Sequence, residues 1–371
     1  MEELFDWLVV AHAPGLGVNT FHTLLDTWRS PTHLLKAVHE RDQIEGLGNK
    51  TLKWLKSPDI KKCEKDLAWS EHEHNHIILF SDPRYPPLLK EIIDPPPLLY
   101  VHGDVSCLSR YQIAMVGSRN PTSGGNETAR QFAHSLVQSG FVITSGLALG
   151  IDAASHRGAM NAAGKTIAVT GTGLDRVYPA RNKPLAHEIV EKGGALVSEF
   201  PIGSPPLANH FPRRNRIVSG LSLGVLVIEA AQRSGSLITA RLAAEQGREV
   251  FAVPGSIHNP LAKGCHRLIR EGAKLVETVM DVLEELGSLI HVEFLDNDSV
   301  EYPENDEILD KEHQKLLECV GYDPISVDML IERTGLTPET VSSMLLILEL
   351  RGFVSSAAGG FIIKTTKESV L

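Results

Sequence analysis

Cysteine is scarce in this sequence: its 371 residues include four, and no two of them form a C-x-x-C pair. Cys63, Cys107, Cys265 and Cys319 are far apart along the chain. This spacing excludes the common cysteine frameworks for metals and is typical of proteins of the reducing cytoplasm. We therefore expect a cytoplasmic protein without a cysteine-bound metal.

Long apolar runs are also lacking, since the longest fall well short of a membrane span. The first residues, MEELFDWLVV, include no basic residue, so we expect no signal peptide. Hydrophobic residues nevertheless make up 42% of the sequence, which suffices for large cores and excludes disorder of the whole chain. At this length, two or three domains are expected.

Lys and Arg are absent from residues 277–310, which carry 12 acidic residues. The whole chain has a net charge of -10, which by itself argues against a nucleic-acid-binding protein. The charge is unevenly distributed, however, because residues 111–276 carry 18 basic and 10 acidic residues, a net charge of +8. An acidic stretch thus conceals a basic central region, and nucleic acid remains a candidate ligand.

Residues 1–75 form the first predicted domain, a set of short helices. Two turns share a Gly-x-Gly pattern, PGLGV at 14–18 and IEGLG at 44–48, and each precedes an amphipathic run. Glycines at a helix start let backbone amides approach a phosphate, as in a helix-hairpin-helix or SAM-like domain that contacts DNA. A purely structural helical cap is the alternative, because a two-glycine match is a weak signal.

Residues 76–110 are rich in proline, which excludes a long helix, and we expect a rigid connector packed on the next domain. In the preceding EHEHNH, His72, His74 and His76 alternate and would share one face of a strand. We expect the solvated start of a strand there; a metal site is the alternative.

Residues 111–287 form the predicted central domain. Six apolar runs alternate with helical stretches: QIAMV (112–116), FVITS (141–145), TIAVT (166–170), ALVSE (195–199), GVLVIE (224–229) and EVFAV (249–253). Strands that are almost continuously apolar are buried on both faces, which is typical of parallel sheets covered by helices. The predicted fold is α/β, a Rossmann-like, doubly wound, mostly parallel sheet.

Residues 288–310 carry eight acidic residues without periodicity, and we expect a self-repelling linker. Residues 311–371 fit three helices, one capped by Thr337, and a hairpin that turns at Gly359-Gly360, which together make a winged helix. The expected recognition helix, from Thr337 to Leu350, has two Glu and no Lys or Arg. We therefore expect this domain to contact protein, or at most to assist DNA binding weakly.

Ligands of doubly wound sheets bind at the carboxyl ends of the strands, so the loops there are the candidate site. The first loop, GSRNPTSGG at 117–125, offers backbone amides, a helix N-terminus and an arginine, which together suit a phosphate. It has neither the G-x-G-x-x-G nor the GK[ST] pattern of dinucleotide and NTP sites, so we expect no cofactor. The later loops add glycine turns and cations, and FPRRNR at 211–216 places three arginines beside an aromatic ring.

The candidate DNA- and phosphate-binding residues share this edge of the predicted sheet. They are Gly117, Ser118, Arg119, Ser123, Gly124, Gly125, Ser145, Gly146, Arg181, Lys183, Phe211, Arg213, Arg214, Asn215, Arg216, Arg233, Ser234, Gly235, Ser236 and Lys263. So many cations favour a strand of phosphates over a small molecule, and Phe211 and Tyr178 are candidates to stack on bases. For each arginine, a surface ion pair is the alternative. No acid–His–nucleophile set stands out, so we expect no catalytic residues.

Four blocks of this chain, in the correct order, resemble the DNA processing protein A (DprA/Smf) family: SDPRYPPLL, MVGSRNPTSGG, SGLALGIDAASHRGA and NHFPRRNRIVSGLS…RSGSLITARLAAEQGREVFAVPGS. The resemblance covers about residues 80–276. It implies a non-enzymatic protein that binds and protects single-stranded DNA and loads the recombinase RecA during natural transformation. It also implies that the Gly117-Ser118-Arg119 loop and the FPRRNR arginines hold the DNA.

Residues 265–275 resemble the self-association and RecA-contacting region of that family. The resemblance implies a homodimer with His266, Ile269 and Leu275 as contacts; the alternative is that these side chains pack on the sheet. Single-strand DNA-binding protein is a further candidate partner.

Two other functions compete with this one. A nucleotide-processing hydrolase of the lysine-decarboxylase-like type would use Glu229 as an acid, whereas the structural interpretation makes Glu229 a carboxylate that braces a loop. RSGSLIT stands where that hydrolase family has a PGGxGT-type loop, which disfavours the enzyme. A transcription regulator led by the winged helix is disfavoured by the missing basic residues in its recognition helix.

Overall fold

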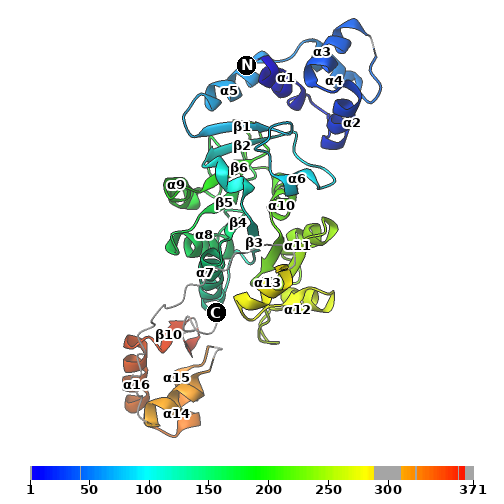
Figure 1. Ribbon diagram of the computed structural model, residues 1–371. Helices are drawn as coiled ribbons and strands as arrows, with labels where there is room; N and C mark the ends of the chain where they lie inside the picture. The colour runs from blue at the N-terminus through cyan, green and yellow to red at the C-terminus, as the bar shows by residue number, and fades with distance from the viewer. Residues whose placement is uncertain (1, 42, 288–310, 322–323, 358, 364–371) are drawn as a thin grey trace. The chain divides into compact units, whose positions relative to one another are not determined.

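A computed structural model describes residues 2–41, 43–287, 311–321, 324–357 and 359–363 (Figure 1). The chain divides into two compact units, residues 1–282 and residues 283–371. The predicted acidic linker, 288–310, lies outside the described residues. Within the part that is described, no helix is both long enough and apolar enough to cross a membrane.

Five short helices open the first unit, as predicted: α1 (Glu2–Ala11), α2 (Val18–Trp28), α3 (Pro31–Glu40), α4 (Asn49–Lys56) and α5 (Ile60–Ser70). The two Gly-x-Gly turns have nearly the same backbone conformation. Gly15 and Gly46 have φ of 81° and 83°, and Gly17 and Gly48 both cap the next helix at φ -74° and ψ 157°. A repeated helix-hairpin-helix geometry is therefore present, and its contact with DNA stays a prediction.

A nine-stranded sheet forms the centre of the first unit, in the order β1-β2-β6-β5-β4-β3-β7-β8-β9. Its strands are β1 (Asn75–Leu79), β2 (Leu98–Gly103), β3 (Gln112–Val116), β4 (Val142–Ser145), β5 (Thr166–Val169), β6 (Ala195–Ser198), β7 (Gly224–Val227), β8 (Glu249–Ala252) and β9 (Lys274–Leu275). The strands from β3 to β9 pair in parallel, whereas β1 and β2 are antiparallel at one edge. All six predicted strands are present, and the predicted Rossmann-like class is confirmed.

The strand order creates the topological switch that this fold uses for ligands. From β3 the chain moves through β4 and β5 to β6 on one side, and then through β7 and β8 to β9 on the other. β3 and β7 are neighbours in the sheet, but the chain leaves them in opposite directions. A crevice therefore forms between the two loops that follow the carboxyl ends of these strands.

Helices cover both faces of this sheet. They are α7 (Ser123–Gln138), α8 (Ile151–Asn161), α9 (Lys183–Glu191), α10 (His210–Gly220), α11 (Ser236–Glu245), α12 (Lys263–Arg270) and α13 (Val279–Leu286). Figure 1 shows α7, α8 and α9 on one side and α10, α11 and α12 on the other. Three shorter helices lie in the connections: α6 (Pro87–Lys90), η1 (Val105–Ser109) and η2 (Ala180–Asn182).

The segment expected to be a rigid connector, 76–110, contributes β1 and β2 to the sheet instead. Both strands are free of proline, and the prolines gather in the turn between them, where Pro96 and Pro97 accept hydrogen bonds from Tyr85 Oη and the Phe80 amide. The prolines lie in the connection 80–97, which also contains α6, and their density hid β2 from prediction. His72 and His74 precede β1, so the predicted alternation of three histidines on one strand face is wrong.

The helical segment is fastened to the sheet by a buried carboxylate. Asp66 on α5 accepts hydrogen bonds from His12 Nε2 at 2.7 Å, from Tyr100 Oη on β2 and from the Ile202 amide at 3.1 Å. Ile77 and Tyr100 also belong to the apolar core of the five helices. The first five helices and the sheet edge therefore share one core.

The second unit contains α14 (Lys311–Val320), α15 (Val327–Thr334), α16 (Pro338–Leu350), β10 (Val354–Ala357) and β11 (Gly360–Ile363). Leu316, Leu330, Leu345 and Val354 are buried in its core. Thr337 caps α16 through a hydrogen bond from the Thr340 amide, as predicted. The two strands pair as an antiparallel hairpin, so the predicted winged helix is confirmed.

Candidate nucleic-acid interface

The carboxyl ends of β3 and β7 open into a cavity of about 750 Å³. Its walls are the loops after β3 and β7, the segment before α10 and the starts of α8, α10 and α11. The lining residues are Val116, Gly117, Ser118, Arg119, Ala148, Asp152, Tyr178, Pro206, Ala208, Phe211, Pro212, Arg214, Asn215, Val218, Ala231, Arg233, Ser234, Gly235, Ser236, Ile238 and Thr239. Three arginines and one carboxyl group thus surround a single space.

Arg214 is the most unusual of these residues, because its guanidinium is buried, with 6% of the residue exposed. Its Nη1 donates to the Val169 carbonyl at 3.0 Å, and its Nε has no partner among the described residues. Gly146 leaves the room that the side chain occupies, since a Cβ there would lie 1.7 Å from Nη1. Burial lowers the Arg214 pKa to about 10, so the group stays charged at neutral pH.

Asp152 lines the same cavity as Arg214 and holds the loop after β4. Its Oδ2 accepts hydrogen bonds from the amides of Gly146 and Ala148, which holds the loop after β4 in place. Burial raises the pKa of this carboxyl group, and the positive charge of Arg214 opposes that effect. Asn182 braces the same loop through hydrogen bonds to the Leu147 and Ala148 carbonyls.

Two aromatic rings stand together at the opening. Tyr178 and Phe211 have ring centroids 5.4 Å apart and a tilt of 44°, and both line the cavity. Phe211 packs on Gly171, whose missing side chain leaves room for the ring, whereas Tyr178 is 49% exposed. An exposed ring beside a basic cavity suits stacking on a base.

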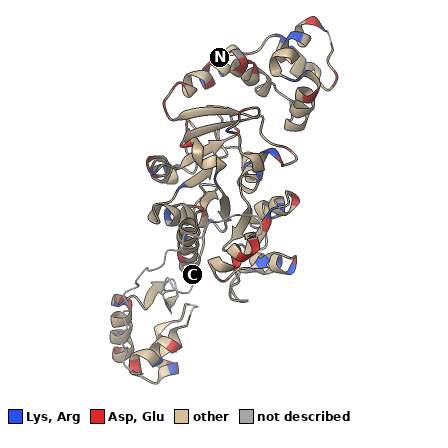
Figure 2. Cartoon of the chain, in the orientation of Figure 1, with Lys and Arg blue, Asp and Glu red and all other residues tan. Residues whose placement is uncertain are grey.

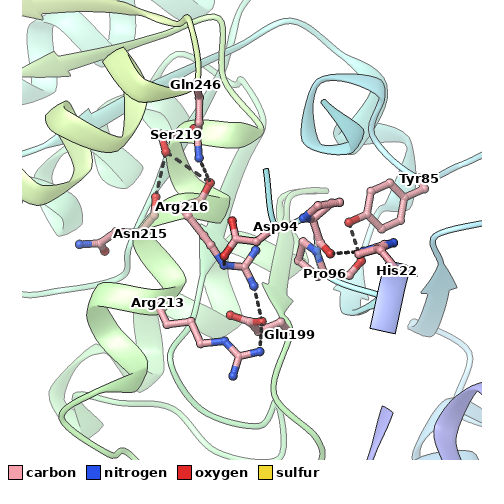
Figure 3. Close-up of polar contacts among 11 residues, drawn as sticks. His22, Tyr85, Asp94, Pro96, Glu199, Arg213, Asn215, Arg216, Ser219 and Gln246 are labelled. Atoms are coloured by element: carbon pink, nitrogen blue, oxygen red, sulfur yellow. Dashed lines mark hydrogen bonds and ion pairs between the residues drawn. The ribbon is translucent and has the colours of Figure 1, made fainter. Parts of the chain in front are cut away.

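The three arginines of FPRRNR, predicted to bind DNA together, have different partners in the structure. Arg213 and Arg216 both donate to Glu199 Oε2, at 2.7 Å and 2.6 Å, and Arg216 Nε also pairs with Asp94 at 3.1 Å (Figure 3). Arg216 is buried with Glu199 and ties α10 to the end of β6. Of the three arginines, therefore, Arg214 alone lines the cavity, because adjacent helical positions point in different directions.

Other predicted residues separate in the same way. Gly117, Ser118, Arg119, Phe211, Asn215, Arg233, Ser234, Gly235 and Ser236 line the cavity together with Arg214. Ser145 is buried and donates to the Met115 carbonyl, so it cannot reach a ligand without rearrangement. Gly146 and Gly125 are spacers, because one packs on Arg214 and the other on Glu229.

The remaining predicted residues lie outside the cavity lining: Ser123, Gly124, Arg181, Lys183 and Lys263. Arg181, Lys183 and Lys263 are exposed, and their contact with DNA stays a prediction. Of the predicted self-association residues, His266 bonds to Gly255 within its own chain and Ile269 packs on the core, whereas Leu275 is 41% exposed.

Sequence reasoning missed several lining residues, among them Asp152, Pro206, Ala208, Ile238 and Thr239. Asp152 was detectable, because it lies in the first turn of α8 after a glycine loop, where the helix dipole favours an acid. The other four are ordinary apolar or hydroxyl residues, and only the tertiary arrangement places them beside the arginines.

The comparisons with known proteins agree with this architecture. Residues 76–287 match the model of the family described as DNA recombination-mediator protein A, and residues 300–360 match the DprA winged helix domain. The chain belongs to the DNA recombination-mediator protein A family. It is 45% identical to Protein Smf of Escherichia coli over 81% of each chain. It is also 45% identical to the DNA processing protein DprA of Bacillus subtilis, over 61% of this chain and 76% of that protein.

Solved structures of the family share the fold. The X-ray structure of DNA processing protein A from Streptococcus pneumoniae superposes with a TM-score of 0.66 at 38% identity, over 76% of this chain and 97% of that one. The Helicobacter pylori protein, described as having a unique single-stranded DNA binding mode, gives a TM-score of 0.53 at 29% identity, over 59% and 99%. The family resemblance expected from the sequence is thereby confirmed.

Proposed function

We propose that this protein binds single-stranded DNA without regard to sequence, through the cavity between the loops after β3 and β7. The observation that carries the proposal is the buried Arg214, whose Nε has no acceptor in the described chain and which lines the same cavity as Arg119 and Arg233. A buried N–H without an acceptor is costly even with the Asp152 carboxyl group nearby, and a DNA phosphate oxygen can accept from it. The Tyr178–Phe211 pair offers a stacking surface that does not distinguish bases.

We further propose a cytoplasmic recombination mediator that protects single strands during natural transformation and delivers them to RecA. The support is family membership together with the single-stranded DNA binding mode described for the Helicobacter pylori relative. Self-association through the region of His266, Ile269 and Leu275 and an interaction with single-strand DNA-binding protein belong to the same proposal.

The winged helix is proposed to contact protein. Its α16 carries no Lys or Arg between Pro338 and Leu350, as Figure 2 shows, and Leu346 and Leu350 are exposed on it. A helix that reads the major groove normally presents basic side chains, which this surface does not offer.

The competing hydrolase is disfavoured by the position of its candidate acid. Both carboxylate oxygens of Glu229 accept hydrogen bonds from Thr122, and Glu229 does not line the cavity. We therefore propose that the protein is not an enzyme. Incubation with nucleoside monophosphates should release no free base, and release that depends on Glu229 would restore the hydrolase.

Competition between oligonucleotides tests the binding function. Fluorescently labelled oligo(dT) is bound to the full-length protein and displaced by unlabelled single-stranded or duplex DNA of equal length. We expect the single strand to compete at a concentration at least about tenfold lower than the duplex, because stacking on Tyr178 needs unpaired bases. Equal competition by the duplex would contradict single-strand binding.

A further inference from the structure

Glu229 joins the two loops that carry the cavity arginines. It follows β7, directly before the loop that bears Arg233, and is 8% exposed. Its Oε2 accepts the Thr122 amide at 2.9 Å and its Oε1 accepts the Thr122 hydroxyl at 2.7 Å. Its backbone carbonyl accepts the Ser118 amide at 2.7 Å. One residue at the end of β7 therefore holds the loop after β3 at two points, on either side of Arg119.

The hydrogen bonds around Thr122 have a fixed direction. Thr122 Oγ1 caps α7 by accepting the Gly125 amide at 2.9 Å, so its own hydrogen is free to point at Glu229. Glu229 in turn accepts one hydrogen bond on each of its two side-chain oxygens. The Glu229 side chain is therefore the final acceptor in this series of hydrogen bonds. Hydrogen bonds to a charged acceptor are stronger than those between neutral groups.

Glu229 is packed tightly against two glycines of the loop after β3. A Cβ on Gly125 would lie 2.4 Å from Glu229 Cδ, and one on Gly117 would lie 2.9 Å from the Glu229 carbonyl oxygen. Both positions therefore require glycine for close approach to Glu229. Gly125 packs directly on the Glu229 side chain, and Gly117, which also lines the cavity, packs on Ile151 and on the Glu229 carbonyl.

We propose that Glu229 is a positioning residue for DNA binding, which fixes Arg119 and the amides of its loop relative to the loop of Arg233. The proposal rests on the function proposed above. A negative charge close beneath an anion site weakens anion binding by repulsion, so its presence there calls for a geometric benefit. The benefit is that the two loops keep a fixed position relative to each other. Arg119 and Arg233 can contact phosphates of the same DNA strand only if the distance between them is fixed.

A double-mutant cycle distinguishes a role of Glu229 in positioning Arg119 from a role in the stability of the fold alone. Glu229→Ala removes both side-chain hydrogen bonds between the loops, Thr122→Val removes the one from the hydroxyl, and Thr122→Ser keeps both. We expect Glu229→Ala and Thr122→Val to weaken oligo(dT) binding about tenfold, because the loop no longer holds Arg119 in a fixed position. Thr122→Ser should bind like the unmodified protein. When combined with Arg119→Ala, Thr122→Val should cost less than about threefold, because the side chain that it positions is gone.

Asp281→Ala is the matched control, since Asp281 accepts the Glu277 and Thr278 amides and the Thr278 hydroxyl far along the chain from the cavity lining. It should lower the thermal midpoint without weakening DNA binding. If Glu229→Ala does not fold, the Thr122 pair and its cycle decide the question alone. Thr122→Val binding like Thr122→Ser, or losing as much with Arg119→Ala as without it, would overturn the positioning role. An Arg119→Ala variant that binds normally would instead refute the proposed DNA site.

Discussion

Buried polar side chains around Arg214 show what single residues contribute. His156 on α8 donates from Nδ1 to Thr166 Oγ1, because the Thr166 hydroxyl gives its own hydrogen to the Ile143 carbonyl. The ring is therefore the neutral Nδ1–H tautomer, and its Nε2 is a buried acceptor without a partner among the described residues. Burial lowers the His156 pKa to about 3, and the charge of Arg214 adds to that effect.

This depressed pKa predicts a pH dependence of stability. Below pH 6.5 the unfolded chain takes up a proton that folded His156 refuses, so stability falls as the pH drops towards 3. Between pH 7 and pH 5 this single group should cost about 2 kcal/mol. In urea unfolding at both pH values, His156→Gln should lose about that much less than the unmodified protein. Parallel losses in the two proteins would contradict the burial argument.

The sequence did not suffice to predict the environment of each individual arginine in the site. The sequence predicted that GSR and FPRRNR would lie at the strand ends, and Arg119 and Arg214 do meet there. It could not distinguish Arg214 from Arg216, because the difference depends on Glu199 and Asp94, which are distant in the sequence. Periodicity assigns an arginine to a helix but does not reveal the carboxylate that pairs with it.

At the level of elements, the helical segment depends on one carboxylate for its attachment. Asp66→Asn should destabilise the five N-terminal helices by at least about 2 kcal/mol, since it weakens three hydrogen bonds to a buried charge. All four tryptophans, Trp7, Trp28, Trp54 and Trp69, lie in this segment, so their fluorescence reports on it. Its urea midpoint should fall, and an unchanged midpoint would contradict the role of Asp66.

The winged helix gives a second prediction at this scale. Because the cavity lies wholly in the first unit, a chain that ends after residue 287 should bind oligo(dT) within about threefold of the full protein. Anisotropy titrations of the two chains decide the matter, with circular dichroism to verify that the shorter one folds. Loss of single-strand binding on truncation would show that the winged helix holds DNA after all.

Elements were more predictable than residues. Six parallel strands and the winged helix follow from apolar runs and caps, because burial on both faces leaves a clear pattern. The start of β1 was expected from EHEHNH, but β2 escaped prediction because the proline-rich connection precedes it, and β9 was missed because it is two residues long. A two-residue edge strand depends on its neighbour for order and has little local pattern.

Over the whole molecule, the uneven charge is the dominant feature. The net charge of -10 includes 12 acidic residues in 277–310. We predict that the segment 288–310 competes with DNA for the basic cavity, because its acids attract the same cations. Removing 288–310 should tighten oligo(dT) binding most at low salt, where screening is weakest. Replacing the segment by an uncharged linker of equal length controls for spacing. Equal affinities at every salt concentration would leave 288–310 as a plain spacer.

The most direct test of the proposed DNA site is the salt dependence of oligo(dT) binding by Arg119→Ala. Arg241→Ala serves as the control, because Arg241 is exposed on α11 and does not line the cavity. Arg119→Ala should bind more weakly at every salt concentration, and the slope of log K against log salt should become shallower by about 0.7 for each lost phosphate contact. Arg241→Ala should keep both the affinity and the slope. An Arg119→Ala variant with the affinity and slope of the unmodified protein would contradict the claim that this cavity grips the DNA backbone.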